Sequence, residues 1–340
     1  MRRALAALTG ALSVVVAAPL GAQEPPSILH TNYVYDETAR SEIFTVAPGD
    51  EPVRLTDDDR FDLDPAWSPD RTRIAYVHQQ DDPRNPDVWV MDADGSDKQR
   101  LTRGPRDDEL PQWSPDGTRI AWVKTRGDDP IGRIFVMASD GSGKELLVRN
   151  ATLPRWSPDG SRIAFMHKRR CDCATDWELR VIDLGSGAVT VLTDNRSDDL
   201  SPAWSPDGER IAFTRFRRDG GGALLTIAPD GSDPERLSGG RQPRAGADWS
   251  PDGSEIAFTV LVDEGDFDTV LAVVDVATEE ERRLTDADLG GLHPEWSPDG
   301  SRIAFLGFVE SSWDLHVVAP DGTGLERVTE TPGDESELDW

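Results

Sequence analysis

The ten residues WSPDGSRIAF at positions 296–305 occur, with small changes, six times in this chain of 340 residues. The Trp-Ser-Pro-Asp segment begins at Trp67, Trp113, Trp156, Trp204, Trp249 and Trp296, and the chain ends on a further Asp339-Trp340 pair. Successive tryptophans are 46, 43, 48, 45, 47 and 44 residues apart. Self-similarity at such a period is typical of arrays in which each repeat is one supersecondary unit.

Each repeat reads as four short strands separated by turn signals. The tryptophan is followed by Ile-Ala-aromatic, as at 303–305, and then by a second β-rich run, as at 315–318. An Asp-Gly-Ser turn often precedes a short last run that ends in Arg-Leu-Thr, as at 100–102. Short strands at regular spacing predict an all-β fold, here a β-propeller of four-stranded antiparallel blades.

The Ser-Pro-Asp-Gly segment has a structural interpretation. Proline presets φ, aspartate suits the next turn position, and glycine accepts the left-handed conformation that closes a tight hairpin. Arg71 replaces this glycine in the first copy, so that turn is predicted to be strained or differently shaped. Six copies of a turn are expected in a repeat protein, whereas six active sites are not. The repeat tryptophans are therefore assigned to packing between neighbouring sheets.

The two ends of the chain predict how the ring closes. The segment before Trp67 contains three strand-like runs, at 28–35, 43–46 and 53–56, and the chain ends with one more, at 336–340. Together they make one complete blade beside six continuous ones. Pairing the ends removes exposed sheet edges, which favours seven blades; six blades with frayed ends is the alternative.

The repeat resembles that of the TolB-like family of WD-like propellers, periplasmic proteins of the Tol–Pal cell-envelope system. The resemblance covers nearly all of residues 27–340 and implies a propeller that binds envelope proteins, such as a peptidoglycan-associated lipoprotein. TolB-like proteins carry an α/β domain before the propeller and usually have six blades. The repeats here start almost at the beginning of the chain and favour seven. The same repeat is similar to those in the propeller domains of prolyl-oligopeptidase-type peptidases.

The first residues read as a secretory signal peptide. Arg2 and Arg3 precede an apolar stretch from Ala4 to Leu20, and small residues follow at 21–22. This order predicts cleavage near residue 23, a single propeller domain over 24–340, and a periplasmic or secreted product that is not inserted in the membrane. The formal net charge of −28 argues against nucleic-acid partners, which need clustered Lys and Arg. We expect a monomer.

The sequence offers little that points to catalysis. It contains no Gly-x-Ser-x-Gly pentapeptide of a serine hydrolase, so no enzyme activity and no cofactor are predicted. Acidic clusters at 57–64 and 263–268 could hold Ca²⁺, although solvated loops are favoured, and no metal site is assigned. Cys171 and Cys173 are the two cysteines; they could form a local disulfide in an exported protein.

A basic arc is predicted where the second strands of consecutive repeats enter their loops. Its residues are His78, Lys124, Arg126, His167, Lys168, Arg169, Arg170, Arg215, Arg217 and Arg218. One interpretation is charge balance against nearby acidic loops. The other is a landing site for an acidic partner or an anionic polymer.

The innermost strands should surround a central channel, where Asp64, His293 and Glu337 are the candidate lining residues. The sequence as a whole predicts an exported, non-enzymatic scaffold that binds a protein or envelope polymer with its rim of long loops and this channel. The alternative is a propeller enzyme, a polysaccharide lyase or glycosidase with its active site at the channel mouth.

Overall fold

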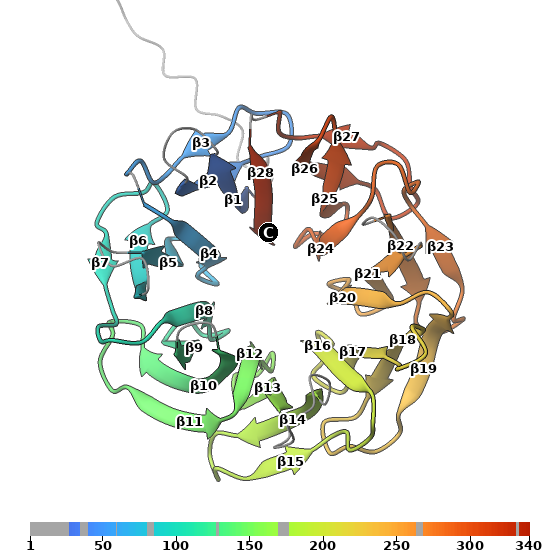
Figure 1. Ribbon diagram of the computed structural model, residues 1–340, viewed down its shortest axis with the longest axis horizontal. Helices are drawn as coiled ribbons and strands as arrows, with labels where there is room; N and C mark the ends of the chain where they lie inside the picture. Colours follow the sequence, from blue (N-terminus) through green and yellow to red (C-terminus); the bar gives the residue numbers. More distant parts are fainter. Residues whose placement is uncertain are drawn as a thin grey trace, which may run out of the picture.

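The computed structural model describes residues 27–34, 40–58, 60–79, 85–126, 129–168, 177–262, 268–330 and 333–340. Within these ranges the regular structure is β, and no helix is long and apolar enough to cross a membrane. The strands form seven antiparallel sheets of four strands each, arranged as a ring around a central axis (Figure 1). The predicted signal peptide at 1–23 and the two cysteines lie outside the described residues.

In six blades the strands follow chain order from the innermost to the outermost position. Two of these blades hold β4 (Asp62–Trp67), β5 (Arg73–Gln79), β6 (Pro86–Asp92) and β7 (Gln99–Arg100), then β8 (Asp108–Trp113), β9 (Arg119–Arg126), β10 (Asp129–Ala138) and β11 (Glu145–Arg149). The next two hold β12 (Ala151–Trp156), β13 (Arg162–Lys168), β14 (Trp177–Asp183) and β15 (Val189–Val191), then β16 (Asp198–Trp204), β17 (Ile211–Phe216), β18 (Gly222–Ile227) and β19 (Glu235–Gly240). The last two hold β20 (Arg244–Trp249), β21 (Glu255–Leu261), β22 (Thr269–Asp275) and β23 (Glu281–Arg283), then β24 (Leu292–Trp296), β25 (Ile303–Val309), β26 (Ser312–Val318) and β27 (Glu326–Arg327).

The seventh blade joins the two ends of the chain. Its order is β28 (Asp334–Asp339), β1 (Ile28–Val34), β2 (Arg40–Val46) and β3 (Val53–Arg54), so the last strand of the chain is the innermost (Figure 1). Strands β28 and β1 are antiparallel, with Leu29 opposite Asp339 and Tyr33 opposite Asp334. The predicted seven-bladed ring, closed by both ends, is confirmed, and the six-bladed alternative is excluded.

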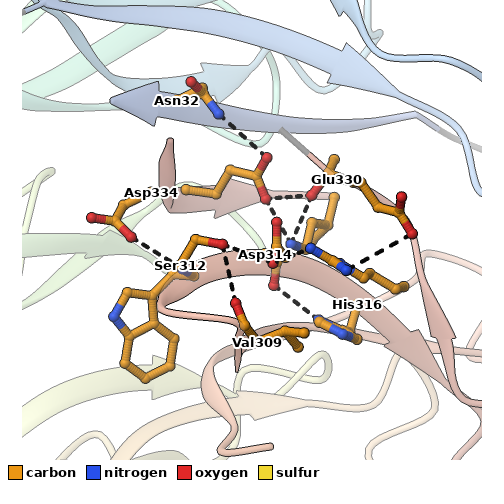
Figure 2. A network of polar contacts seen from close by, with 12 residues as sticks. Asn32, Val309, Ser312, Asp314, His316, Glu330 and Asp334 are labelled. Carbon is orange, nitrogen blue, oxygen red and sulfur yellow. Dashed lines mark hydrogen bonds and ion pairs between the residues drawn. The ribbon is translucent and has the colours of Figure 1, made fainter. Parts of the chain in front are cut away.

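Polar side chains on β28 also join the closing blade to the preceding one (Figure 2). The backbone N–H of Trp313 donates to Asp334 at 3.1 Å, and that of Leu315 donates to Glu335 at 2.7 Å. Asn32 on β1 donates to the same Glu335 carboxylate at 3.4 Å. Because buried backbone N–H groups need acceptors, these carboxylates fix β28 against both neighbours.

The Ser-Pro-Asp-Gly segments form tight turns between first and second strands. In the second copy, the Ser114 hydroxyl donates to Asp116 at 2.6 Å and accepts from the backbone N–H of Arg119 at 2.9 Å. Gly117 has φ of +67°, as predicted for a left-handed turn position. Arg71 adopts the same conformation, with φ of +55° and the same hydrogen bond to the Ser68 carbonyl, 2.8 Å long. The first turn therefore keeps its shape at the cost of a left-handed arginine.

The repeat tryptophans lie between neighbouring blades, which explains their spacing. The indole N–H of Trp113 donates to the Ala66 carbonyl of the preceding blade at 3.2 Å. The guanidinium of Arg73 stacks over the same indole, 4.7 Å from the ring centre. The pattern continues with Arg119 over Trp156 and Arg162 over Trp204. The arginine before Ile-Ala-aromatic thus covers the tryptophan of the next repeat.

The threonine that ends the Arg-Leu-Thr segment, or its variants Val-Leu-Thr at 191–193 and Arg-Val-Thr at 327–329, joins the third and fourth strands. In each of five blades its hydroxyl accepts a hydrogen bond from a third-strand backbone N–H; the five residues are Thr56, Thr102, Thr193, Thr285 and Thr329. Such a side-chain acceptor replaces the ladder bond that a very short fourth strand does not supply. This explains why the segment recurs in the sequence.

Candidate functional site

The channel wall is built from the same two positions of each innermost strand. The residue three places before the repeat tryptophan and the residue directly before it line a central cavity of about 640 Å³. The first set is Asp64, Leu110, Leu153, Ser201, Gly246, His293 and Glu337. The lining members of the second set are Gln112, Arg155, Ala203, Asp248, Glu295 and Asp339. Asp64, His293 and Glu337, the channel candidates from the sequence, all lie on this wall.

The first set shares an unusual backbone conformation. All seven residues have φ between +49° and +53°, a region that residues other than Gly rarely adopt. At the same place the pairing of the first and second strands is shifted; in β4 it jumps from Leu63 to Ala66. Such a bulge bends a strand and turns its side chains. The repeated bulge therefore determines what each blade presents to the channel.

Negative charge is concentrated on one side of the wall. Asp248, Glu295 and Asp339 come from β20, β24 and β28, which are innermost strands of consecutive blades. Glu337 on β28 and Asp64 on β4 extend this series to the next blade. Among the described lining residues, Arg155 on β12 is the cation that acts on these groups. We call the five carboxylates the channel carboxylates.

Several channel carboxylates also connect blades through backbone hydrogen bonds. Asp248 accepts from the N–H of Trp296 at 2.7 Å, and Asp64 accepts from the N–H of Leu110 at 3.0 Å. Where Asp precedes the repeat tryptophan, it takes over the contact to the next blade. The indole N–H of Trp296 is then left without a hydrogen-bond partner among the described residues, unlike that of Trp113.

The enclosed position of four channel carboxylates, Asp64, Asp248, Glu295 and Asp339, raises their pKa values. They keep some contact with water, yet protein surrounds them on most sides. This burial raises the pKa of Asp248 and of Asp339 to about 6. Burial and the Glu337 carboxylate together raise the pKa of Asp64 to about 7. The pKa of Glu295 lies well above its usual range, because of burial and then of Asp248.

Three members of the predicted basic arc form ion pairs within their own blades. Lys124 lies 2.8 Å from Asp108, Arg215 lies 2.6 Å from Asp199, and His78 Nδ1 lies 2.7 Å from Asp62. In each pair a buried aspartate, five residues before the repeat tryptophan, lies 16 residues before the basic side chain. This constant separation is a sequence signal that points to pairing inside a blade.

The other members of the arc differ in exposure. Arg217 and Arg218 are exposed, and Arg217 pairs with Asp219 of its own hairpin at 3.2 Å. Lys168 lies over the ring of Trp177, 4.8 Å from its centre. His167 is half-buried, and burial lowers its pKa to about 4. Arg169, Arg170 and the side chain of Arg126 lie outside the described residues.

Asp248, Glu295, Asp339 and Arg155 were not among the residues singled out from the sequence. Each directly precedes a repeat tryptophan, so the motif itself marks the position. Side chains two residues apart on a strand point to the same face. That rule, applied to Glu337, leads to Asp339 and thus to the second set of lining residues.

Comparison with known proteins places this architecture in a family. A family model described as the TolB beta propeller domain matches residues 32–171 and 71–340. None of the curated proteins matches the chain. Among solved structures, TolB from Acinetobacter baumannii is 22% identical with a TM-score of 0.59; the alignment covers 79% of this chain and 66% of that one.

Enzymes with the same fold are also similar to this chain. An oligogalacturonate lyase in complex with manganese is 18% identical with a TM-score of 0.67, covering 90% of this chain and 85% of that one. A puromycin-hydrolysing peptidase of Mycobacterium tuberculosis is 17% identical with a TM-score of 0.70, covering 89% of this chain and 51% of that one. At such identities the likeness shows the fold alone. Because the family model spans most of the chain, the protein belongs to the TolB beta propeller domain family.

Proposed function

We propose that this protein is an exported binding scaffold without catalytic activity, which takes up an envelope protein or polymer at its loop-bearing rim and in its central channel. The observation that supports this most directly is the charge of the channel, where five carboxylates face one arginine. A ligand with a positively charged group would fill the cavity and neutralise this charge. We therefore infer that the part of the partner that enters the channel is cationic, such as a Lys- or Arg-bearing protein segment.

The raised pKa values give this proposal a measurable consequence. A cation that enters the channel stabilises the ionised carboxylates, which lowers their pKa values toward the ordinary range. Binding near pH 6 therefore releases protons, and affinity increases as the pH is raised from about 5 to 7.5. A ligand held by packing alone would show neither effect.

The basic arc is retained in the proposal as a second contact on the rim. Its exposed members, Arg217 and Arg218, can meet acidic groups of a partner that also reaches the channel, with Arg217 exchanging its exposed pair with Asp219 for the partner. Lys124 and Arg215 are held by aspartates of their own blades, so we assign them a smaller part. Charge contacts at an exposed rim mainly affect the association rate and its salt dependence.

The experiment compares three immobilised forms of residues 24–340 in an envelope extract from the source cells. One form is wild type, and one carries Asp248→Asn, Glu295→Gln and Asp339→Asn. The third carries Glu51→Gln, Glu145→Gln and Glu280→Gln, which changes the charge equally at exposed sites. We expect a partner retained by the wild type and the surface control, lost with the channel variant, and weakened by salt. Equal retention by all three forms would contradict a role of the channel.

One observation favours the alternative, a polysaccharide lyase or glycosidase. A carboxylic acid whose pKa is raised by burial, as those of Glu295 and Asp64 are, suits a general acid. The test is incubation with oligogalacturonate and other polysaccharides, followed by measurement of unsaturated and reducing ends. Product formation that Glu295→Gln abolishes would replace the scaffold by an enzyme.

A further inference from the structure

Three innermost strands begin with a buried aspartate opposite a basic residue of the second strand. Two of these aspartates are neutralised by a permanent cation. Lys124 Nζ lies 2.8 Å from both oxygens of Asp108. Arg215 donates through Nε at 2.6 Å and Nη2 at 2.9 Å to the two oxygens of Asp199. In both blades each carboxylate oxygen has a partner, and the pair carries no net charge.

Asp62, the third of these aspartates, is satisfied only in part. Its partner across the strand pair is His78, whose Nδ1 lies 2.7 Å from Oδ1. Asp62 is fully buried, and its Oδ2 has no hydrogen-bond partner among the described residues. A buried carboxylate oxygen without a donor is costly. The blade that holds β4 therefore lacks something that the other two blades supply.

A second carboxylate increases this deficit. Asp58, four residues before Asp62, lies 3.8 Å from His78 Nδ1. The residue at the same position before Asp199 is Asn195, whose amide donates to the aspartate at 2.6 Å. An ionised aspartate has no proton to donate, so Asp58 adds negative charge where the blade that holds β16 supplies a donor. The charge of the exposed Lys98 lowers the pKa of Asp58, but in the part of the chain that the structure describes the two side chains form no ion pair.

We propose that Asp58, Asp62 and His78 bind a divalent transition-metal ion of the Zn²⁺ or Mn²⁺ class. One ligand atom from each residue lies within 4.8 Å of the other two. An imidazole with two carboxylates suits such ions, whereas Ca²⁺ takes oxygen ligands. Ligands at about 2.0–2.2 Å from one ion stand roughly 3–3.5 Å apart, close to the present separations. On binding, the Nδ1 proton of His78 leaves to solvent and the metal takes its place.

The surroundings of the three residues fit a site that is loaded from the rim. The side chain of Asp58 is 45% exposed and that of His78 is 15% exposed, which leaves an approach from solvent and a position for a water ligand. Trp89 packs its edge on the His78 ring, 5.1 Å between centres, and limits its movement. The Ser41 hydroxyl donates to the Asp62 carbonyl at 2.9 Å and holds the start of β4. The metal would fix the segment between β3 and β4 on the rim. This role is independent of ligand binding in the channel.

The test is titration of the metal-stripped full-length mature protein with ZnCl₂ and with MnCl₂ at about 150 mM salt, where weak surface binding is screened. We expect one saturable equivalent for at least one of the two ions in the wild type and a rise of its melting temperature on saturation. His78→Lys gives Asp62 a lysine partner, as Lys124 is for Asp108. This variant should therefore keep the melting temperature of the metal-free protein and lose the equivalent of bound metal. Asp58→Asn places an amide where the blade of β16 has Asn195, and it should weaken metal binding at least about tenfold.

Lys124→His is the matched control. It places a histidine beside Asp108, but the residue four places before Asp108 is Gly104, which offers no side-chain ligand. This variant should keep the single equivalent of the wild type and gain none. The proposal is overturned if the wild type shows no saturable equivalent for either ion, or if His78→Lys binds as tightly as the wild type.

Discussion

Glu337 on β28 accepts a hydrogen bond from the backbone N–H of Asp64 on β4, with an N–Oε2 distance of 3.0 Å. The same oxygen accepts from the hydroxyl of Thr31 on β1 at 2.8 Å. One side chain near the end of the chain therefore contacts its own blade and the next one. The ring is closed at its inner edge by polar contacts as well as by strand pairing, and the last residues of the chain carry both.

Deletion of residues 336–340 should lower the melting temperature by more than 10 °C. It removes most of β28, the buried Leu338 and Trp340, and the contacts of Glu337. Loss of two buried large side chains costs about 4–8 kcal/mol, and one kcal/mol corresponds to roughly 2 °C in a domain of this size. Thermal unfolding followed by circular dichroism checks this. Glu337→Gln keeps the acceptor and should shift the transition by less than a third as much.

Four of the channel carboxylates, Asp64, Asp248, Glu295 and Asp339, should contribute stability that decreases as the pH rises from about 5 to 7.5. Burial raises their pKa values, so in this window these groups bind more protons in the folded protein than in the unfolded chain. Buried histidines such as His167, whose pKa is lowered, contribute in the opposite direction, so the channel contribution is obtained as a difference between two proteins. Denaturant unfolding at several pH values compares the wild type with the variant that carries Asp248→Asn, Glu295→Gln and Asp339→Asn. The variant should gain stability relative to the wild type as the pH rises; the same difference at pH 5 and pH 7.5 would contradict the prediction.

Asp248→Asn is the variant that assigns part of this slope to one group. The amide oxygen still accepts from the N–H of Trp296, but it carries no charge at any pH. We expect a gain on the order of 1 kcal/mol at pH 7.5, after allowance for screening by channel water, and none at pH 4. An equal change at both pH values would mean that the substitution acts through packing.

The turn of the repeat motif can be tested at one hydroxyl. Ser114→Ala should cost about 1–2 kcal/mol, because it leaves the backbone N–H of Arg119 without its acceptor and removes one of the donors to Asp116. Ser142 is an exposed turn serine, and Ser142→Ala should change stability by less than about 0.5 kcal/mol. Equal effects of the two substitutions in urea unfolding would show that the buried hydroxyl has no special role.

The sequence was sufficient to predict the architecture because each structural requirement of a blade leaves a mark in every repeat. The spacing of Trp67 to Trp296 gave six units, and the strand-like runs at the two ends gave the seventh. Arg71 shows a local limit. The sequence marked the turn as unusual, whereas the structure shows that it keeps the shared shape with a left-handed arginine.

The channel was harder to predict, because its properties arise from the closed ring. Asp64, His293 and Glu337 were identified as lining candidates by their place in the first strands. That Asp248, Glu295 and Asp339 gather on one side depends on which blades are neighbours and on the bulge in each strand. The basic residues Lys124 and Arg215 were visible in the sequence, while their aspartate partners, 16 residues earlier, were not recognised.

Arg155 provides the sharpest test of the electrostatic account. Its charge lowers the pKa values of Asp64, Asp248, Glu295 and Asp339. Its guanidinium donates to the Pro154 carbonyl at 3.4 Å. Arg155→Gln should therefore raise those pKa values further. Since a higher folded-state pKa means a larger loss of stability as the pH rises, the variant should resemble the wild type at pH 5 and be less stable by about 1–2 kcal/mol at pH 7.5. Unfolding in urea at both pH values measures this difference. An equal loss at the two pH values would show that Arg155 acts by packing in the channel wall and not by its charge.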